Sequence, residues 1–350
     1  MAALRILVMG AGAVGGYVGA HLARAGLEPV LIDAWPEHVE AMRRHGLSIQ
    51  GVTAGEAFTT PVRALHVTDA QQLAREAPFD VAFICVKSYD TEWAAMLVRE
   101  FLGTTGCAVS LQNCMNDARL EGVVGKGRAL GCIASRILVD LVAPGRVVRG
   151  VGKGGPAYTV FRVGEHDGRV SERAQAVARA LEAADSAKAT ANLWGERWAK
   201  LAANAMENGM SACTGMSGNA IARSEPHRRF QIRLAAETIR TGQALGHRLE
   251  PVVGIDPERF ARAAEGDADD LAHVEAVLLG HAAKRADGQV ASMGQDMRKG
   301  RRTEIDYING YVVDCAAELG REVPANRRLR DLVRAVERGT AKPDPASVLG

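Results

Sequence analysis

Three polar side chains recur at intervals of four residues in a stretch that is otherwise apolar. Residues 194–210 are rich in Ala, Leu and Met, and they contain Lys200, Asn204 and Asn208. In a helix this spacing places the three side chains on one face, within roughly 80° of arc. Buried polar groups are costly without partners. The three side chains could bind a ligand. They could instead be exposed to solvent, or the two amides could be core groups that cap neighbouring loops. Spacing alone leaves these alternatives open.

A second stretch rich in polar residues runs from 291 to 310 and includes Ser292. Within it, Thr303-Glu-Ile-Asp306 is typical of a capping box, which places Glu304 in the first turn of a helix. The basic run at 298–302 is typical of a solvated face, although near a cofactor it could also favour anions.

Residues 4–33 predict the element that would hold a cofactor. A short apolar run is followed directly by Gly10-x-Gly12-x-x-Gly15, then by a helix-compatible segment that ends at Gly26. In a dinucleotide site, one glycine makes the tight turn, one lets the backbone approach a pyrophosphate, and one lets helix and strand pack closely. The free N–H groups and dipole of the helix then hold the phosphates. The predicted cofactor contacts here are Gly10, Gly12, Ala13, Val14, Gly15 and Asp33.

Asp33 ends the second apolar run and bears on which dinucleotide binds. It stands some eighteen residues after Gly15, where the ribose-binding acid of NAD enzymes belongs. A carboxylate there bonds ribose hydroxyls and repels a 2′-phosphate, and no Arg or Lys follows it before Arg43. We therefore expect a preference for NAD(H) over NADP(H).

Polar residues follow two further predicted strands. The run at 80–86 delivers Lys87, and the run at 107–111 delivers Gln112 and Asn113. Open α/β sheets bind their ligands at the carboxyl ends of the strands. Lys87 and Asn113 are therefore candidate site residues.

The remaining pattern divides the chain in two. Helices are expected at 37–45, at 69–76 with Asp69 as its cap, and at 171–184. Short strands are expected at 47–68, and antiparallel or edge strands that close the sheet at 131–163. Residues 185–191 read as a domain junction, because they are small and polar. From Asn192 strand signals nearly vanish and helix formers dominate. Residues 340–350 read as a frayed tail.

The composition narrows the class of protein. The chain has 350 residues, 47% of them hydrophobic and 24% charged, which is ordinary for a globular protein. A net charge of +2 and an aromatic content of 5% argue against nucleic-acid or membrane partners. Six cysteines without a CxxC pair favour a reducing, cytoplasmic compartment and no metal site. No apolar run approaches the roughly 18 residues of a membrane span.

Over nearly its whole length the sequence resembles the ketopantoate reductase family. The resemblance rests on the glycine loop and on four motifs: Val86-Lys-Ser-Tyr89, Leu111-Gln-Asn113, Trp198-Ala-Lys-Leu-Ala-Ala-Asn-Ala-Met-Glu-Asn208, and Ser292-Met-Gly-Gln-Asp-Met-Arg with Thr303-Glu-Ile-Asp-Tyr-Ile-Asn-Gly310. It implies an α/β Rossmann dinucleotide-binding domain followed by an all-α domain of the 6-phosphogluconate dehydrogenase C-terminal type. We expect these domains at 1–186 and 190–340, with a tail at 341–350.

The resemblance also implies roles for individual residues. In that family the lysine matching Lys200 is the general acid, and the residue matching Glu304 assists catalysis. The residues matching Asn204, Asn208 and Ser292 hold the substrate. This division suits ketone reduction, because hydride arriving at the carbonyl carbon leaves negative charge on oxygen, which an ammonium stabilises and protonates. An ammonium partly withdrawn from water gives up its proton more readily.

Two more roles follow at the nicotinamide end. The residues matching Lys87 and Asn113 lie there in the family. We therefore expect Asn113 to contact both substrate and cofactor, and Glu304 to lie beside the cofactor as well. The implied reaction is NAD(P)H-dependent reduction of a 2-oxo acid, with 2-dehydropantoate (ketopantoate) giving (R)-pantoate, a step of pantothenate biosynthesis, as the first candidate.

Three departures from the family pattern keep other readings open. The family usually has Gly at the position of Cys114 and Pro at the position of Gly209, and both positions border the substrate. Its well-known members use NADPH and have a basic residue at the position of Asp33. An alternative is an NAD-dependent D-2-hydroxy acid dehydrogenase with a bulkier substrate. A non-catalytic dinucleotide sensor is less favoured, because a sensor would not need all five of the polar residues Lys200, Asn204, Asn208, Ser292 and Glu304. The expected partner is a small molecule, and a homodimer is one candidate assembly.

Overall fold

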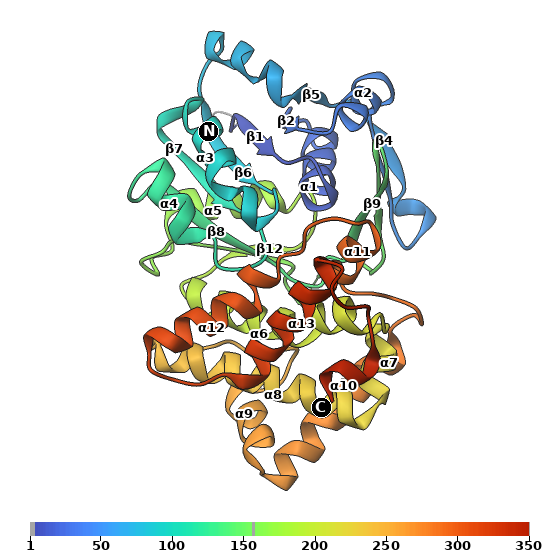
Figure 1. Ribbon diagram of the computed structural model, residues 1–350. Coiled ribbons are helices and arrows are strands. Elements are labelled where there is room, and N and C mark those ends of the chain that lie inside the picture. The colour runs from blue at the N-terminus through green and yellow to red at the C-terminus, as the bar shows by residue number, and fades with distance from the viewer. Residues whose placement is uncertain (1–3, 156–157, 350) are drawn as a thin grey trace. The chain divides into compact units, whose positions relative to one another are not determined.

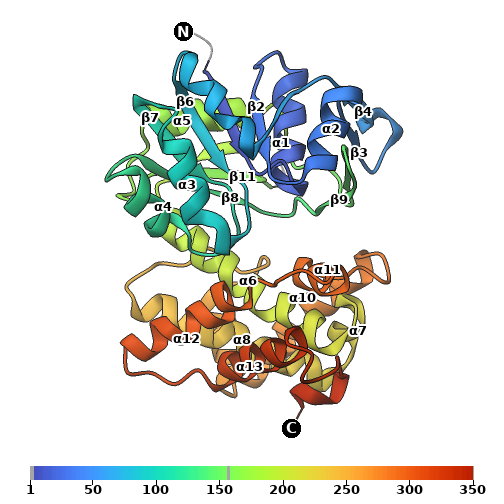
Figure 2. The same cartoon turned by 45° about the horizontal axis from the view of Figure 1, so that its top comes forward.

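A computed structural model of the chain describes residues 4–155 and 158–349. The chain divides into two compact units, one ending at Leu193 and the other beginning at Trp194. The first unit is α/β and the second is helical, as the strand signals that fade after Asn192 predict. Figures 1 and 2 label helices and strands of both units.

An eight-stranded sheet forms the centre of the first unit, in the order β12-β11-β8-β7-β6-β1-β2-β5. Six neighbouring strands of this sheet, in the spatial order β8-β7-β6-β1-β2-β5, run parallel in the usual Rossmann order. Strand β11 pairs antiparallel with β8. The strands are β1 (Ile6–Met9), β2 (Val30–Asp33), β5 (Arg63–His66), β6 (Phe79–Ile84), β7 (Leu102–Ser110), β8 (Ala129–Ala134), β11 (Phe161–Gly164) and β12 (Ala187–Ala189).

Both faces of this sheet are buried, because alternate side chains of each strand point to opposite sides. Ile6 and Val8 of β1 join one apolar core, together with helices α1, α2 and α5. Leu7 and Met9 join the other core, with helices α3 and α4. Figure 1 shows the helices around the strands. The helices of this unit are α1 (Ala13–Arg24), α2 (Pro36–His45), α3 (Thr91–Arg99), α4 (Asp117–Val124), α5 (Glu172–Leu181) and the 3-10 helices η1 (Ala54–Glu56), η2 (Val67–Arg75) and η3 (Ser88–Asp90).

A second, smaller sheet has the order β4-β3-β10-β9. It joins strands from distant parts of the sequence, because β3 (Leu47–Gln50) pairs in parallel with β10 (Arg146–Arg149). The outer strands, β4 (Phe58–Thr60) and β9 (Val139–Ala143), pair antiparallel with them. The prediction that residues 131–163 close the main sheet is therefore wrong for β9 and β10, which leave it for this second sheet.

Two local predictions in the first unit are also corrected. Residues 185–191 do not form a plain junction, because β12 lies in them and extends the large sheet beside β11. The unit consequently ends a few residues later than the predicted 186. The helix expected at 69–76 is a 3-10 helix that begins at Val67, and its cap is the His66 side chain. Asp69 instead forms an ion pair with Arg43 at 2.6 Å.

The second unit is helical, apart from one isolated bridge between Val252 and Ile255 among its described residues. Helices α8, α12 and α13 pack against one another, and α9 packs against both α8 and α10. Its helices are α6 (Leu193–Thr214), α7 (Gly218–Arg223), α8 (Glu225–Ala244), α9 (Pro257–Glu265), α10 (Ala268–Lys284), α11 (Ser292–Arg298), α12 (Asn309–Glu318), α13 (Pro324–Glu337) and the 3-10 helices η4 (Ile305–Tyr307) and η5 (Pro345–Val348).

The frayed tail predicted at 340–350 is wrong for the residues that the structure describes, which exclude Gly350. The segment ends in η5, and Val348 is only 1% exposed. The Arg328 guanidinium donates to the Ser347 carbonyl at 2.7 Å, and the Asp344 backbone N–H donates to the Cys213 carbonyl at 2.9 Å. These contacts fix the segment on the helical unit.

Candidate active site

The glycine loop after β1 has the close packing that its spacing predicts. Gly10 has φ +92°, and a Cβ there would lie 2.9 Å from the Val86 side chain and backbone. A Cβ at Gly15 would lie 2.0 Å from the Gly10 carbonyl oxygen and 2.9 Å from the Cys85 Cβ. The loop therefore lies directly against the end of β6, next to the segment that carries Lys87.

Gly12 is different, because its ideal Cβ would have no atom within 4 Å. Packing does not require a glycine here, so the space beside its backbone is open to a ligand. Gly12 is also the N-cap of α1, and no side chain caps the helix. Ala13 and Val14 are half-buried in its first turn. The first turn therefore presents backbone N–H groups and the positive end of a twelve-residue helix, which fit a pyrophosphate.

Asp33 ends β2, as predicted, and remains half-buried. Its Oδ1 accepts a hydrogen bond from the Trp35 backbone N–H at 2.9 Å, which leaves the other oxygen for a further donor. Arg43, the first arginine after Asp33 in the sequence, forms its hydrogen bonds with other groups. Its guanidinium donates to the Ala64 carbonyl, to Glu40 and to Asp69.

Lys87 and Asn113 follow β6 and β7, and a buried network ties their two loops together. The Gln112 amide donates to the Val86 carbonyl at 2.8 Å. The Asn116 amide donates to the Ser88 hydroxyl at 3.0 Å and to the Asn113 carbonyl at 2.9 Å. Both loops are thus held at the carboxyl edge of the sheet. Asn116 was not predicted as a site residue, because its signal in the sequence is only an amide three residues beyond Asn113 in the same loop.

Cys114 has φ +68° and is 4% exposed. This left-handed conformation costs a residue with a Cβ about 1–2 kcal/mol, which explains why a family would place glycine there. Cys114 therefore adopts the left-handed conformation that favours glycine while adding a side chain next to Asn113.

On α6, the three predicted polar residues are not solvent-exposed. Lys200 is half-buried, Asn204 is 7% exposed and Asn208 is 6% exposed. The Asn204 Nδ2 is buried and has no hydrogen-bond partner. A buried amide N–H without a partner costs about 1–3 kcal/mol, so this group favours an acceptor supplied from outside the chain. The alternative of exposed polar residues is excluded for the two amides.

The same face of α6 continues to Ser211, which sequence analysis missed. Ser211 lies three residues beyond Asn208, a helical spacing that could have revealed it. It is 3% exposed, and its hydroxyl has no partner. A Cβ at Gly294 would lie 3.0 Å from the Ser211 Cβ, so α11 packs on this face. Ser292 is half-buried in the first turn of α11.

Glu304 is 6% exposed and precedes η4 rather than lying inside a helix. The predicted capping box does not form, because the Thr303 hydroxyl accepts from the Ile305 N–H at 3.4 Å and Asp306 pairs with Arg334. The segment is instead anchored by Glu337 of α13, which accepts from the Thr303 backbone N–H at 2.8 Å and from its hydroxyl at 3.1 Å.

The Glu304 segment also packs against α6. The Asn309 amide donates to the Ala205 carbonyl at 3.1 Å. A Cβ at Gly209 would lie 2.9 Å from Leu329 and 3.3 Å from Ile305. Close packing among apolar side chains therefore accounts for glycine at 209.

The described residues contain no group of three or more His, Cys, Asp or Glu that could hold a metal ion. Across these same ranges, no helix has the length and apolar character needed to cross a membrane.

Comparisons with known proteins match these features. The family described as "Ketopantoate reductase PanE/ApbA" matches residues 6–157, and "Ketopantoate reductase PanE/ApbA C terminal" matches residues 192–337. A 2-dehydropantoate 2-reductase of Archaeoglobus fulgidus is 30% identical over 340 residues, covering 96% of this chain and 98% of the relative.

Solved structures share the fold. A PanE/ApbA family ketopantoate reductase from Ralstonia eutropha has a TM-score of 0.77 and 28% identity, covering 96% of this chain and 99% of its own. A D-mandelate dehydrogenase solved with NADH and anilino(oxo)acetate has a TM-score of 0.79 at 20% identity, covering 96% of this chain and 99% of its own, and shows a likeness of fold alone. The predicted fold class is confirmed, and the chain belongs to the ketopantoate reductase family of oxidoreductases.

Proposed function

We propose that this protein reduces 2-dehydropantoate to (R)-pantoate with a nicotinamide dinucleotide as hydride donor. The observation that carries the proposal is the α6 face, where half-buried Lys200 lies one turn from the unpartnered Nδ2 of Asn204. Lys200 can donate a proton, and the buried N–H of Asn204 needs an oxygen acceptor. A 2-oxo acid supplies such an oxygen. The family membership and the name of the Archaeoglobus fulgidus relative point to the same substrate.

In this proposal the helical unit handles the substrate. Lys200 stabilises the charge that develops on the carbonyl oxygen and donates a proton to it. Glu304, held in place through Thr303 and Glu337, orients the ammonium or the nascent hydroxyl. Ser292, Asn204 and Asn208 hold the carboxylate and the carbonyl group of the substrate.

The α/β unit handles the dinucleotide. The bound nicotinamide supplies the hydride. The backbone N–H groups of Gly12, Ala13 and Val14 at the start of α1 hold the pyrophosphate, while Gly10 and Gly15 shape the turn. Lys87 and Asn113 serve the nicotinamide end, with Asn113 also contacting the substrate.

We further propose that NAD(H) is preferred. Asp33 keeps one carboxylate oxygen for the ribose, and the guanidinium of Arg43 is neutralised by Glu40 and Asp69. A 2′-phosphate would meet a carboxylate about 4 Å away, which costs on the order of a few kcal/mol at an effective dielectric near 20.

Cys114 supports a second candidate, an NAD-dependent D-2-hydroxy acid dehydrogenase with a bulkier substrate. A side chain at φ +68° beside Asn113 changes the surface that the family usually builds with glycine. This candidate keeps the same proton donor and differs only in the acid accepted.

A panel of 2-oxo acids tests these candidates, with NADH and NADPH compared side by side through the absorbance of the reduced nicotinamide. We expect the highest kcat/KM with 2-dehydropantoate and NADH. A bulky aromatic 2-oxo acid that turns over faster than 2-dehydropantoate would establish the dehydrogenase instead. Dinucleotide binding without turnover of any acid would favour a sensor.

We also propose a homodimer and a cytoplasmic location. Sedimentation of the purified protein would measure its mass in solution, and cell fractionation would locate it. A monomeric mass over the working concentration range would contradict the dimer.

A further inference from the structure

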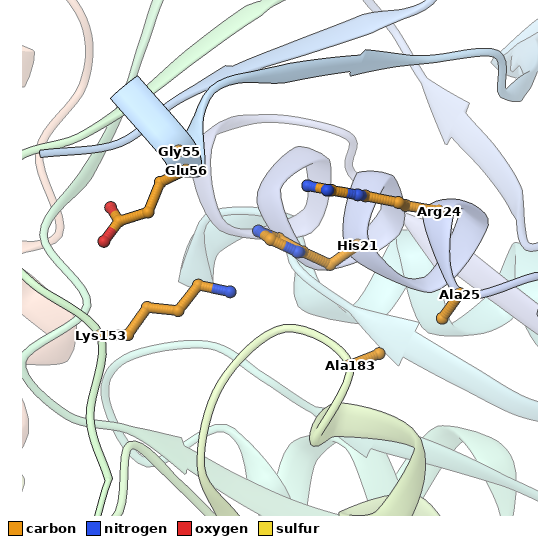
Figure 3. Close-up of a pocket in the computed structure, with 7 residues that line it drawn as sticks. All are labelled: His21, Arg24, Ala25, Gly55, Glu56, Lys153 and Ala183. Carbon is orange, nitrogen blue, oxygen red and sulfur yellow. The ribbon is translucent and has the colours of Figure 1, made fainter. Parts of the chain in front are cut away.

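A pocket of about 420 Å³ lies in the first unit at the C-terminal end of α1, away from the glycine loop. Figure 3 shows its lining. His21 and Arg24 come from the last turn of α1, Glu56 comes from η1, and Lys153 follows β10. Ala25 and Ala183 contribute small side chains, which leave the space open. The volume is within the range of about 300–1,000 Å³ that small-molecule sites occupy.

The imidazole of His21 is the unusual group in this pocket. His21 is 6% exposed, and its Nε2 is buried without a hydrogen-bond partner. Burial, reinforced by Lys153 and Arg24, lowers the pKa of His21 to about 3. The imidazole is therefore neutral near pH 7. The centroid of its ring lies 4.5 Å from the centroid of the Tyr17 ring and 4.8 Å from that of the Phe58 ring. Packing against these two rings restricts the orientation of the imidazole.

Two cations face the same space as this ring. In Figure 3 the His21 ring lies between the guanidinium of Arg24 and the ammonium of Lys153. Arg24 is held there by its position over the Phe58 ring, 4.4 Å from the centroid. Desolvation lowers the pKa of Lys153, so part of the hydration of its ammonium has been lost.

The charge balance of the pocket favours an anion. Near His21 and Lys153, Arg149 and Asp185 form a buried ion pair at 2.6 Å, and their charges cancel. Arg24 and Lys153 then face one carboxylate, that of Glu56, whose Oε2 accepts from the Val52 N–H. The C-terminal end of α1 contributes only about half a negative charge. A net positive charge remains beside the buried Nε2 of His21, which lacks a partner and can donate to an anion when it carries the ring proton.

We propose that this pocket binds a small oxyanion, the carboxylate or phosphate group of a metabolite, through Arg24, Lys153 and His21. The ligand accepts a hydrogen bond from the His21 Nε2 in the tautomer that carries its proton there, and it offsets the positive charge of Arg24 and Lys153 that Glu56 leaves uncompensated. The site is separate from the pyrophosphate contacts, because α1 has twelve residues and is about 18 Å long. Binding here therefore does not depend on the proposed reaction.

The test follows the imidazole C–H signals of His21 by NMR, assigned with the His21→Gln variant, while inorganic phosphate or malonate is added. We expect saturable shifts in the native protein. Lys153→Gln should weaken binding at least tenfold, and the exposed Lys126→Gln in the same unit should leave it unchanged. Saturation by phosphate alone or by malonate alone identifies the group that the pocket accepts.

Two results would overturn the proposal. One is an absence of saturable His21 shifts with either anion in the native protein. The other is equal weakening by Lys153→Gln and Lys126→Gln, which would mean that general surface charge causes the effect. Circular dichroism of each variant confirms that the fold is intact, and the native protein alone decides the first result if a variant fails to fold.

Discussion

The two units prepare their ligand groups in different ways. In the α/β unit, the groups proposed to hold the dinucleotide are mostly backbone N–H groups at the start of α1, shaped by Gly10 and Gly15. In the helical unit, the groups proposed to hold the substrate are side chains on α6 and α11, and one of them, the Nδ2 of Asn204, is buried without a hydrogen-bond partner. Substitutions should therefore act through backbone shape in the first unit and through lost side-chain groups in the second.

The largest expected effect lies in the helical unit. Lys200→Ala should lower kcat by roughly 10²–10⁴-fold, the usual contribution of a positioned acid. Dinucleotide affinity should change little, because the contacts proposed for the pyrophosphate and the ribose lie in the other unit. Steady-state kinetics with the best acid of the panel, beside a dinucleotide titration, measure both quantities. Lys284→Ala, an exposed lysine of the same unit, is the control. Near-normal turnover of Lys200→Ala would remove this residue from the mechanism.

Gly12→Ala isolates the backbone contribution in the α/β unit. The added Cβ meets no atom of the protein, so the melting temperature should hold, yet it occupies the space left for the pyrophosphate. The loss of a hydrogen bond to a charged group, about 2 kcal/mol, should weaken dinucleotide binding roughly thirtyfold.

Gly15→Ala is the contrasting variant. Its Cβ would clash with the Gly10 carbonyl, so overpacking should cost about 1–3 kcal/mol of stability. Thermal unfolding and fluorescence titration separate the two variants. Unchanged dinucleotide affinity in Gly12→Ala would show that the pyrophosphate does not approach this backbone.

Ser292→Ala tests the substrate contact on α11. We expect KM for the 2-oxo acid to rise by about 5- to 30-fold, which corresponds to about 1–2 kcal/mol for one hydrogen bond to a carboxylate. The value of kcat should change less. A fall in kcat at constant KM would instead assign Ser292 to the transition state.

Asp33→Ser tests cofactor choice. Removal of the carboxylate should shift the ratio of kcat/KM for NADH to that for NADPH by about tenfold toward NADPH. Asp33→Asn serves as the isosteric control and should move the ratio in the same direction, because it also removes the charge. A clear NADPH advantage in the native protein would mean that Asp33 does not face the ribose.

The smallest effect is structural. Val348→Ala should lower the free energy of unfolding by about 1–2 kcal/mol, because Val348 is buried in the final segment of the helical unit. Chemical denaturation measures it. Leu349→Ala, at an exposed neighbour, is the control. An unchanged midpoint for Val348→Ala would return the segment to the frayed tail that its sequence suggested.

Much of the secondary structure could be predicted from the sequence, because interactions among residues close in the chain determine it. Alternating apolar side chains in a strand and glycines at fixed spacing act over a few residues, so β1, the turn at Gly10 and the end of β2 at Asp33 follow directly. The helical spacing of Lys200, Asn204 and Asn208 likewise places them on one face of α6. The catalytic and binding roles of these residues stay predictions.

Contacts between distant segments were decided by the tertiary structure alone. β3 pairs with β10, which begins about a hundred residues later, and no local pattern in 139–149 shows that these strands leave the main sheet. β12 consists of Ala, Lys and Ala, which carry no strand signal until β11 offers its free edge. The last segment is polar and contains two prolines, yet Val348 is buried. Residues of α8 and α13 and the Cys213 carbonyl of α6 supply hydrogen-bond partners for the backbone of Asp344, Pro345 and Ser347. Local sequence sets which conformation each segment prefers, whereas burial and backbone hydrogen bonding across the chain decide which segments meet.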